Sequence, residues 1–233
     1  MEIDVPFEEA MRERELVAEL MRPRGSEMDV SIALALFFAA RGKGVVRNHV
    51  TTNSDGLSAE EAEGKETEYM YTTPARILLS GLGADELFGG YSRHATAFAR
   101  NGFAGLTAEL ELDVARLGSR NLGRDDRVVS HWGREVRYPF LDEDVVSWAV
   151  SRGVGEICGF GMVPECDEGT EGGERKEREE GSGELEPGKL VLRLLTYKLG
   201  MKQVAREKKR AIQFGARTAK MMGGGRRGDD AFV

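Results

Sequence analysis

The sequence predicts an α/β protein that is predominantly helical. Apolar residues recur at helical spacing along much of the chain, whereas one short apolar run, Ile77–Leu79, is bounded by turn residues like a buried strand. A glycine-rich turn follows that run, as in α/β folds that bind ligands where a parallel strand ends. With 233 residues, 40% of them hydrophobic, the chain is long enough to bury a core.

The first third of the chain predicts two helices and a loop. Residues 7–21 alternate charged and apolar positions, which predicts a surface helix ended by Pro23 and Gly25. Asp29 is placed to cap a second helix over 30–41, whose continuous apolar content predicts burial. Residues 51–73 are rich in Ser, Thr, Glu and Gly without periodicity, so we expect a solvated loop.

Helical spacing returns after the glycine-rich turn, over 106–117 and again over 189–199. Between these helices, residues 153–188 combine glycine and glutamate with few large apolar side chains. Such a segment cannot offset its ordering entropy by burial, so the composition predicts disorder. We therefore expect one domain over 1–222, interrupted by insertions at 51–73 and 153–188, and a flexible tail over 223–233.

Composition disfavours several classes of protein. The net charge of −7 argues against a general nucleic-acid binder, and a charge run such as 206–217 is usually a solvated surface. The longest apolar stretch, 32–40, is too short to span a bilayer, and no signal peptide opens the chain, so we expect no membrane and a cytoplasmic location. Two cysteines and three scattered histidines favour neither a disulfide framework nor a zinc site.

The turn after the strand, with the sequence SGLGADELFGGY, has two interpretations. Glycines such as Gly81 and Gly83 let backbone N–H groups approach a phosphate, and a carboxylate such as Asp85 at a strand end can hold Mg²⁺ against a polyphosphate. The alternative is a purely structural strand-to-helix turn. From the glycines alone, both interpretations stay open.

Three segments in order change that balance. Ser80 to Tyr91 (SGLGADELFGGY), Arg137 to Asp142 (RYPFLD) and Lys189 to Arg193 (KLVLR) resemble the synthetase domain of glutamine-dependent asparagine synthetases. Two further strings, SRNLGRDD over 119–126 and KRAIQFGARTAK over 209–220, resemble the eukaryotic asparagine synthetase domain-containing proteins.

The resemblance implies a partial synthetase domain over 1–222, the C-terminal part of an adenine-nucleotide alpha-hydrolase-like (PP-loop ATP pyrophosphatase) fold. It implies that ATP and Mg²⁺ activate aspartate as an acyl-adenylate, which ammonia from glutamine, released by a separate glutaminase domain, converts to asparagine. On this resemblance Asp85 is the metal ligand, Lys189 neutralises phosphate charge, and nucleotide contacts come from Ser80, Gly81 and Gly83.

Other residues of the matched segments have plainer interpretations. Arg137 is expected to orient the Pro-Phe-Leu-Asp turn. Aromatic residues near a glycine pair are more often core than cofactor site, so we expect packing roles for Phe88, Tyr91 and Phe140. Glu86 is either a support for the site or a first-turn acid that favours the helix dipole.

The sequence departs from the family pattern in three ways. It contains no Ser-Gly-Gly-x-Asp-Ser string, and Met1 is followed by Glu2 rather than by a nucleophilic cysteine. Leu82 stands where the family has glutamate, and leucine can neither accept a proton nor hydrogen-bond an amine. We therefore expect that this chain alone forms no asparagine. The alternative function is a non-catalytic binding or assembly module, or a truncated gene product, that keeps the fold without activity.

Overall fold

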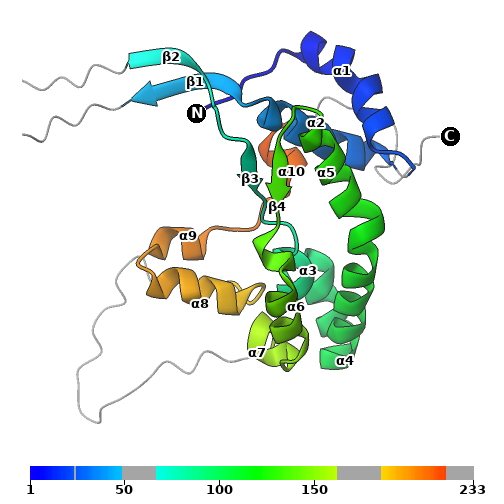
Figure 1. Cartoon of the computed structure of the whole chain (residues 1–233). Coiled ribbons are helices and arrows are strands. Elements are labelled where there is room, and N and C mark those ends of the chain that lie inside the picture. The colour runs from blue at the N-terminus through cyan, green and yellow to red at the C-terminus, as the bar shows by residue number, and fades with distance from the viewer. Residues whose placement is uncertain (24, 49–66, 162–184, 219–233) are drawn as a thin grey trace, which may run out of the picture. The chain divides into compact units, whose positions relative to one another are not determined.

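The computed structural model describes residues 1–23, 25–48, 67–161 and 185–218. Its described residues are mostly helical with a small amount of sheet, which confirms the predicted α/β class (Figure 1). The chain divides into two compact units. Unit 1 comprises Met1–Leu78, Gly123–Val136 and Ala211–Val233, and unit 2 comprises Leu79–Leu122 and Arg137–Arg210.

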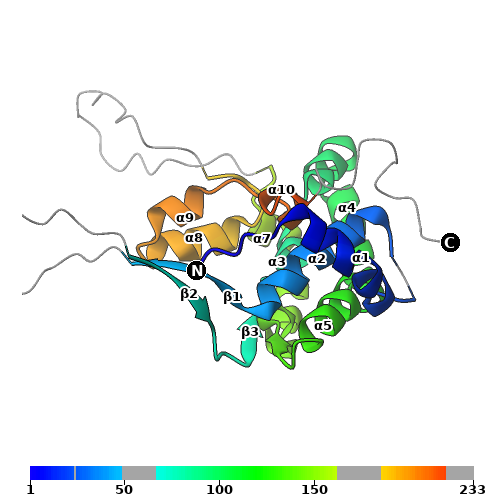
Figure 2. The same cartoon turned by 90° about the horizontal axis from the view of Figure 1, so that it is seen from above.

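Unit 1 contains a group of helices that pack against one another (Figures 1 and 2). They are α1 (Phe7–Leu20), α2 (Glu27–Arg41), α5 (Gly123–Ser130) and the short α10 (Ile212–Gly215). The predicted surface helix and the predicted buried helix are both confirmed, since α2 buries most of one side, including Leu34 and Phe37. The rings of His131 and Trp132 lie within 5.2 Å and 4.9 Å of the Phe37 ring.

The predicted cap of α2 is wrong. Ser26, not Asp29, is the N-cap: its backbone is extended and its Oγ accepts a hydrogen bond from Asp29 N at 3.2 Å. The helix therefore begins three residues earlier than expected. Asp29 lies in the first helical turn, where its carboxylate accepts from Ser26 Oγ at 2.8 Å and faces the Arg124 guanidinium.

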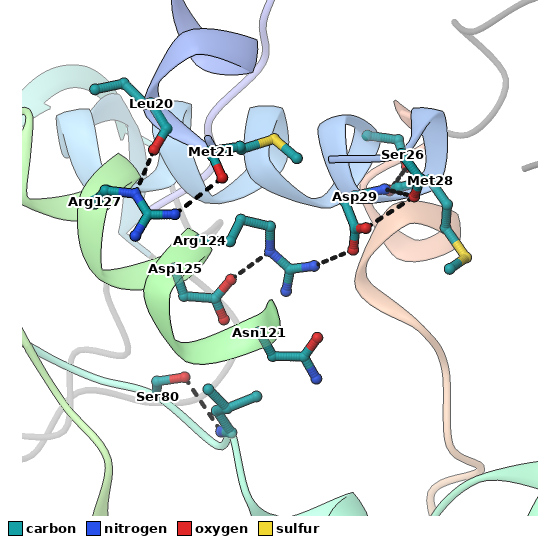
Figure 3. A network of polar contacts seen from close by, with 12 residues as sticks. Leu20, Met21, Ser26, Met28, Asp29, Ser80, Asn121, Arg124, Asp125 and Arg127 are labelled. Carbon is teal, nitrogen blue, oxygen red and sulfur yellow. Dashed lines mark hydrogen bonds and ion pairs between the residues drawn. The ribbon is translucent and has the colours of Figure 1, made fainter. Parts of the chain in front are cut away.

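A buried polar network joins α5 to α1 and α2 (Figure 3). Arg124 Nη1 lies 2.8 Å from Asp29 Oδ1, and Arg124 Nε lies 2.7 Å from Asp125 Oδ1; all three side chains are buried. Arg127 donates to two carbonyl oxygens where α1 ends, those of Leu20 and Met21, at 2.6 Å and 2.9 Å. Arg124 and Asp125 of the string SRNLGRDD thus belong to the contact between α5 and α2, and the neighbouring Arg127 joins α5 to the end of α1.

The first sheet is an antiparallel ribbon of β1 (Lys43–Asn48) and β2 (Thr67–Thr72), in register from Lys43 opposite Thr72. The prediction of a loop over 51–73 is wrong for β2. That strand is rich in threonine and tyrosine, which fit a pleated surface, and this local preference prevails over the polar composition of the longer window. The rest of the predicted loop, 51–66, lies outside the described residues.

The second sheet consists of β3 (Ile77–Leu79) and β4 (Glu135–Arg137). Glu135 N donates to Arg76 O at 2.8 Å and Ser80 N donates to Arg137 O at 2.9 Å. These bonds advance in the same direction along both strands, so the pairing is parallel, as predicted. The predicted burial is wrong: Ile77 is 55% exposed and Leu79 77% exposed. Among the described residues only β4 pairs with β3, and a two-stranded sheet leaves such side chains uncovered.

Unit 2 has its own apolar core, built around Phe88, Leu106 and Ile157. Its helices are α3 (Ala84–Phe88), α4 (Ser92–Leu117), α6 (Glu143–Val150), α7 (Val154–Cys158), α8 (Leu190–Lys198) and α9 (Lys202–Arg206), with a π-helical turn at Gly118–Leu122 and a 3₁₀ turn at Pro139–Leu141. Figures 1 and 2 show α8 and α9 side by side. No described helix is long and apolar enough to cross a membrane.

The predicted disorder over 153–188 is wrong at its N-terminal end. Residues 154–158 form α7, and both Ile157 and Cys158 lie in the core of unit 2. Burial raises the pKa of Cys158 to about 12, so its side chain packs as a neutral thiol. These few apolar residues are enough to anchor one helical turn, and averaging over a long window hid them. Residues 162–184 lie outside the described residues.

The helix predicted over 106–117 is confirmed as the second half of α4, which is sharply bent. Asn101 and Gly102 have non-helical backbone angles. Arg93 Nε lies 3.2 Å from Glu109 Oε1, although residues sixteen apart on a straight helix would be separated by roughly 24 Å. The two halves of α4 therefore lie against each other. The predicted helix over 189–199 is confirmed by α8.

Candidate functional site

The candidate site begins at the turn between β3 and α3, in unit 2. Ser80 Oγ accepts a hydrogen bond from Leu82 N at 3.2 Å, which closes the turn. Gly83 has a φ of 98°, and a Cβ at this position would lie 2.5 Å from Leu141 Cδ2. Glycine is therefore needed at position 83 for the backbone and for packing. No atom lies within 4 Å of a Cβ built on Gly81.

This turn places Asp85 in the first turn of α3. Its carboxylate lies over the backbone of Gly90, where an added Cβ would approach Asp85 Oδ1 to 1.9 Å. Gly90 N in turn donates to the Asp85 carbonyl at 2.9 Å. Gly90, the second glycine of the Gly-Gly pair, thus makes room for the Asp85 side chain.

Two lysines from a distant part of the sequence meet this carboxylate. Lys189 Nζ lies 2.8 Å from Asp85 Oδ1, and Lys209 Nζ lies 3.4 Å from Asp85 Oδ2. The three side chains keep between 22% and 24% of their surface exposed, so the cluster is partly open to solvent, although Asp85 Oδ1 itself is buried. We call Asp85, Lys189 and Lys209 the Asp85 cluster. It carries two positive charges and one negative charge.

Lys189 is held in an unusual backbone conformation. It is the N-cap of α8, with a left-handed φ of 61° and ψ of 33°. A side chain other than glycine pays about 1–2 kcal/mol for this conformation. The backbone contacts hold it there, because Lys189 N donates to Phe88 O at 2.8 Å and Lys189 O accepts from Arg193 N at 3.0 Å.

Arg193, the last residue of the KLVLR segment, binds the backbone just before α8 and at the end of α9. Its buried guanidinium donates to Gly188 O at 2.9 Å, to Ala205 O at 2.7 Å and to Glu207 O at 2.8 Å. The last of these carbonyls lies two residues before Lys209. Arg193 therefore returns the segment after α9 to the start of α8, where Lys189 lies.

The buried carboxylate of Glu86 supports the turn between β3 and α3. Glu86 is 2% exposed; its Oε2 accepts from Gly83 N at 3.1 Å, and its Oε1 accepts from Tyr91 Oη at 2.6 Å and from Asn121 Nδ2 at 3.1 Å. Three donors thus satisfy this buried charge. Burial of the phenol, together with the charge of Glu86, raises the pKa of Tyr91, so the phenol stays protonated and remains a donor.

The Tyr91 ring contacts two cations. Lys209 Nζ lies 4.4 Å and Arg93 Cζ lies 4.0 Å from its centroid. Arg93 also pairs with Asp113, which lies 2.8 Å from His94 Nε2. Tyr91 N donates to His94 Nδ1 at 3.3 Å, which places the ring proton of His94 on Nε2.

The described residues do not fit a magnesium ion by themselves. Both oxygens of Asp85 face ammonium groups, and Glu86 is committed to its own three donors. No group of three or more His, Cys, Asp or Glu side chains with metal-binding geometry occurs among them. Two ammonium groups open to solvent fit an anion instead.

The structure brings together two of the predicted site residues, Asp85 and Lys189, and places Ser80, Gly81 and Gly83 in the turn that leads to them. The Gly83 N–H is used by Glu86. Lys209, which opens the string KRAIQFGARTAK, is a residue of the site that the motifs do not single out. It lies within a basic run, and charge runs usually form solvated surfaces.

Comparisons with known proteins give the same family as the motifs. The family described as Asparagine synthase matches residues 101–154. The chain is 39% and 38% identical over 222 residues, 95% of its length, to proteins of Bos taurus and Homo sapiens named Asparagine synthetase domain-containing protein 1. It is 36% identical over the same share to an asparagine synthetase domain-containing protein of Saccharomyces cerevisiae.

The chain covers only part of these relatives: 29% of the bovine and human proteins and 33% of the yeast protein. It is also 50% identical over 76 residues, 33% of its length, to a Methanocaldococcus jannaschii protein named for glutamine-hydrolysing asparagine synthetase. No solved structure matches the chain significantly. The resemblance seen in the three motifs is thus confirmed.

Proposed function

Because the chain resembles asparagine synthetase domain-containing proteins over 95% of its length, we propose that the Asp85 cluster binds the phosphates of ATP in a PP-loop-type synthetase site. In the complete protein this site converts aspartate to asparagine, with ammonia that a glutaminase domain releases from glutamine. The observation that supports the proposal is the convergence of Lys189 and Lys209 on Asp85 at a solvent-open position.

The proposed reaction needs positive charge near the pyrophosphate that leaves ATP. An oxygen of the aspartate side-chain carboxylate attacks the α-phosphorus of ATP, and the bond to the β-phosphate oxygen breaks, releasing pyrophosphate. Ammonia then attacks the acyl carbon, loses a proton, and AMP departs. The Lys189 and Lys209 ammonium groups stabilise the negative charge that develops on the pyrophosphate, and Asp85 holds them apart.

A magnesium role for Asp85, implied by the resemblance, would require both ammonium groups to leave its oxygens first. The contribution of Asp85 on the present contacts is to orient the two lysines before the nucleotide arrives, which lowers the entropy lost on binding.

The test is ATP binding by isothermal titration calorimetry. Removing one ammonium group with Lys189→Met should weaken ATP binding about tenfold, the usual scale for a charge-assisted contact. Lys198→Met removes the same charge from an exposed position at the end of α8 and should leave the affinity unchanged. Equal effects of the two variants, or none from Lys189→Met, would contradict the proposal.

Leu82 supports a second candidate, a module that binds nucleotide without forming an amide. The residue lies within the turn, between Ser80 and Gly83, and its side chain offers no acid or base. Asparagine formation from aspartate, ATP and ammonium, measured with AMP and pyrophosphate release, separates the two candidates. We expect ATP binding but no asparagine from this chain of 233 residues, and none from its Leu82→Glu variant. Asparagine made by the complete protein would exclude the second candidate.

A further inference from the structure

We infer that Tyr91 is a positioning residue whose ring holds the Lys209 ammonium at the Asp85 cluster. This inference deepens the proposed function and rests on it for the anion, the phosphates of ATP, that Lys209 would meet. It replaces the expectation that Tyr91 only fills the core. The proposal assigns no direct contact between Tyr91 and the nucleotide.

Lys209 needs such a support because its backbone belongs to no helix or strand. It lies after α9, which ends at Arg206, within residues 207–211 that have no regular secondary structure. Its ion pair with Asp85 spans 3.4 Å, longer than the 2.8 Å that separates Lys189 from the same carboxylate. Asp85 therefore binds Lys209 less tightly than it binds Lys189, since charge-assisted hydrogen bonds are usually shorter than 3 Å.

The ring of Tyr91 supplies a second hold. Lys209 Nζ lies 4.4 Å from the ring centroid, well within the range in which an aromatic face attracts an ammonium group. The same ammonium thus faces a carboxylate and an aromatic ring at once. The two contacts restrict its position where one alone would leave the long side chain free to rotate.

Tyr91 is itself rigidly placed. Its Oη donates to the buried Glu86 at 2.6 Å, and its backbone N donates to His94 Nδ1 at 3.3 Å. The raised pKa of the phenol keeps its hydroxyl protonated, so Tyr91 remains the donor of the first of these bonds. Arg93 lies 4.0 Å from the ring centroid and is tied to Asp113 and Glu109. A ring anchored at its phenol and at its backbone can define where Lys209 lies.

A packing role for Tyr91 and a positioning role predict different results in a double-mutant cycle. If the ring acts through Lys209, removing the ring should cost nothing further once the ammonium is gone. If the ring only packs, its loss should add to that of Lys209. A conservative variant separates the ring from the hydroxyl: Tyr91→Phe loses the phenol anchor but keeps the aromatic face and the backbone anchor, so it should restore most of the affinity that Tyr91→Leu loses.

The experiment measures ATP affinity by calorimetry, with thermal unfolding recorded for each variant. Tyr91→Leu should weaken ATP binding about five- to tenfold, between the scale of an exposed cation–π contact and that of a desolvated one, because the Lys209 side chain is partly exposed. Lys209→Met should weaken it at least as much, and the double variant no more than Lys209→Met alone. Tyr197→Leu is the matched control, because Tyr197 also faces cations, Lys202 and Arg206, but on α8 and α9 away from Asp85.

The outcomes that would overturn the inference are additive losses in the double variant, equal effects of Tyr91→Phe and Tyr91→Leu, or the same loss from Tyr197→Leu. If Tyr91→Leu does not fold, nuclear magnetic resonance of the unaltered chain decides. The ε-methylene protons of Lys209 should be shifted upfield by the ring relative to those of its exposed neighbour Lys208, and the absence of that shift would refute the inference. A chain that shows the shift but binds no ATP would refute the proposed function alone.

Discussion

Lys189 combines a disfavoured backbone with a charged side chain that points at Asp85. Its left-handed conformation costs free energy that glycine would not lose, yet a lysine stands at this position. Strain of this kind persists where the surroundings fix the residue, here through Phe88 O and Arg193 N. The contact of the Lys189 ammonium group with Asp85, rather than the stability of α8, therefore explains why lysine stands at this position.

This distinction predicts the effect of Lys189→Gly. The substitution relieves the strained φ but also gives the unfolded chain more freedom, so the free energy of unfolding should change by less than about 1 kcal/mol. ATP affinity should fall about tenfold, as in Lys189→Met, because the ammonium group is lost. Urea denaturation and calorimetry on the same sample measure both effects. A loss of several kcal/mol in stability would show that the lysine is structural.

Glu86 gives the opposite expectation, a stability defect at a residue outside the Asp85 cluster. In Glu86→Gln the new amide group would face one of the three donors, Gly83 N, Tyr91 Oη or Asn121 Nδ2. We expect a loss of about 1–3 kcal/mol in the free energy of unfolding, the cost of an unsatisfied buried group. Glu111→Gln, at an exposed position of α4, is the control, and an equal loss in it would contradict the assignment.

Among the elements, those with a long and regular pattern were predicted correctly. The apolar spacing of α1, α2 and α8 extends over two turns or more, so it identifies a helix before any tertiary contact is known. Two elements that were predicted as loop or disorder, β2 and α7, are short, and each lies at the edge of a long polar segment. Their stability comes from pairing with β1 and from the core of unit 2, which composition does not report.

The bend in α4 has a predicted dependence on pH. Burial of Asp113 opposes its ionisation, but hydrogen bonds from His94 and Arg93 outweigh burial and hold its pKa below the ordinary value. A carboxyl whose pKa is lowered by folding contributes stability above its unfolded pKa, about 3.9, and loses it as the pH falls through the folded value. The free energy of unfolding should therefore decline below about pH 4.

In Asp113→Asn this part of the acid dependence should disappear, while the stability at neutral pH drops by about 1–3 kcal/mol because His94 and Arg93 lose a charged acceptor. Thermal unfolding from pH 3 to pH 7 measures both effects. An unchanged slope between pH 3 and pH 4 in the variant would assign the dependence to other carboxyls.

At the scale of the whole molecule, motifs identified two of the three residues of the Asp85 cluster, and tertiary structure supplied the third. Asp85 and Lys189 were predicted because each belongs to a long motif. Their meeting, and the arrival of Lys209, depend on how Arg193 folds the chain back after α9, which no local pattern encodes. The exposure of β3 was missed for the same kind of reason, because burial depends on which strands pair beside it.

The polar network of unit 1 should govern the stability of that unit. Arg124→Met removes the guanidinium that faces both Asp29 and Asp125, and breaking such a buried ion pair costs about 3–5 kcal/mol. Hydrogen exchange should quicken in α2 and α5 more than in α3 and α8, whose core lies in unit 2. Arg12→Met, exposed on α1, should change neither set, and uniform quickening in Arg124→Met would show that the two units unfold together.

The closeness of Gly90 to Asp85 links the two positions across natural variation. The Asp85 carboxylate occupies the space that any side chain at position 90 would need, since a Cβ there would lie 1.9 Å from Oδ1. A lineage that keeps the aspartate can therefore not exchange the glycine, whereas one that loses the aspartate is released from that restriction. We expect the two positions to covary among homologues. A homologue with a residue other than glycine at position 90 should also lack the aspartate at position 85.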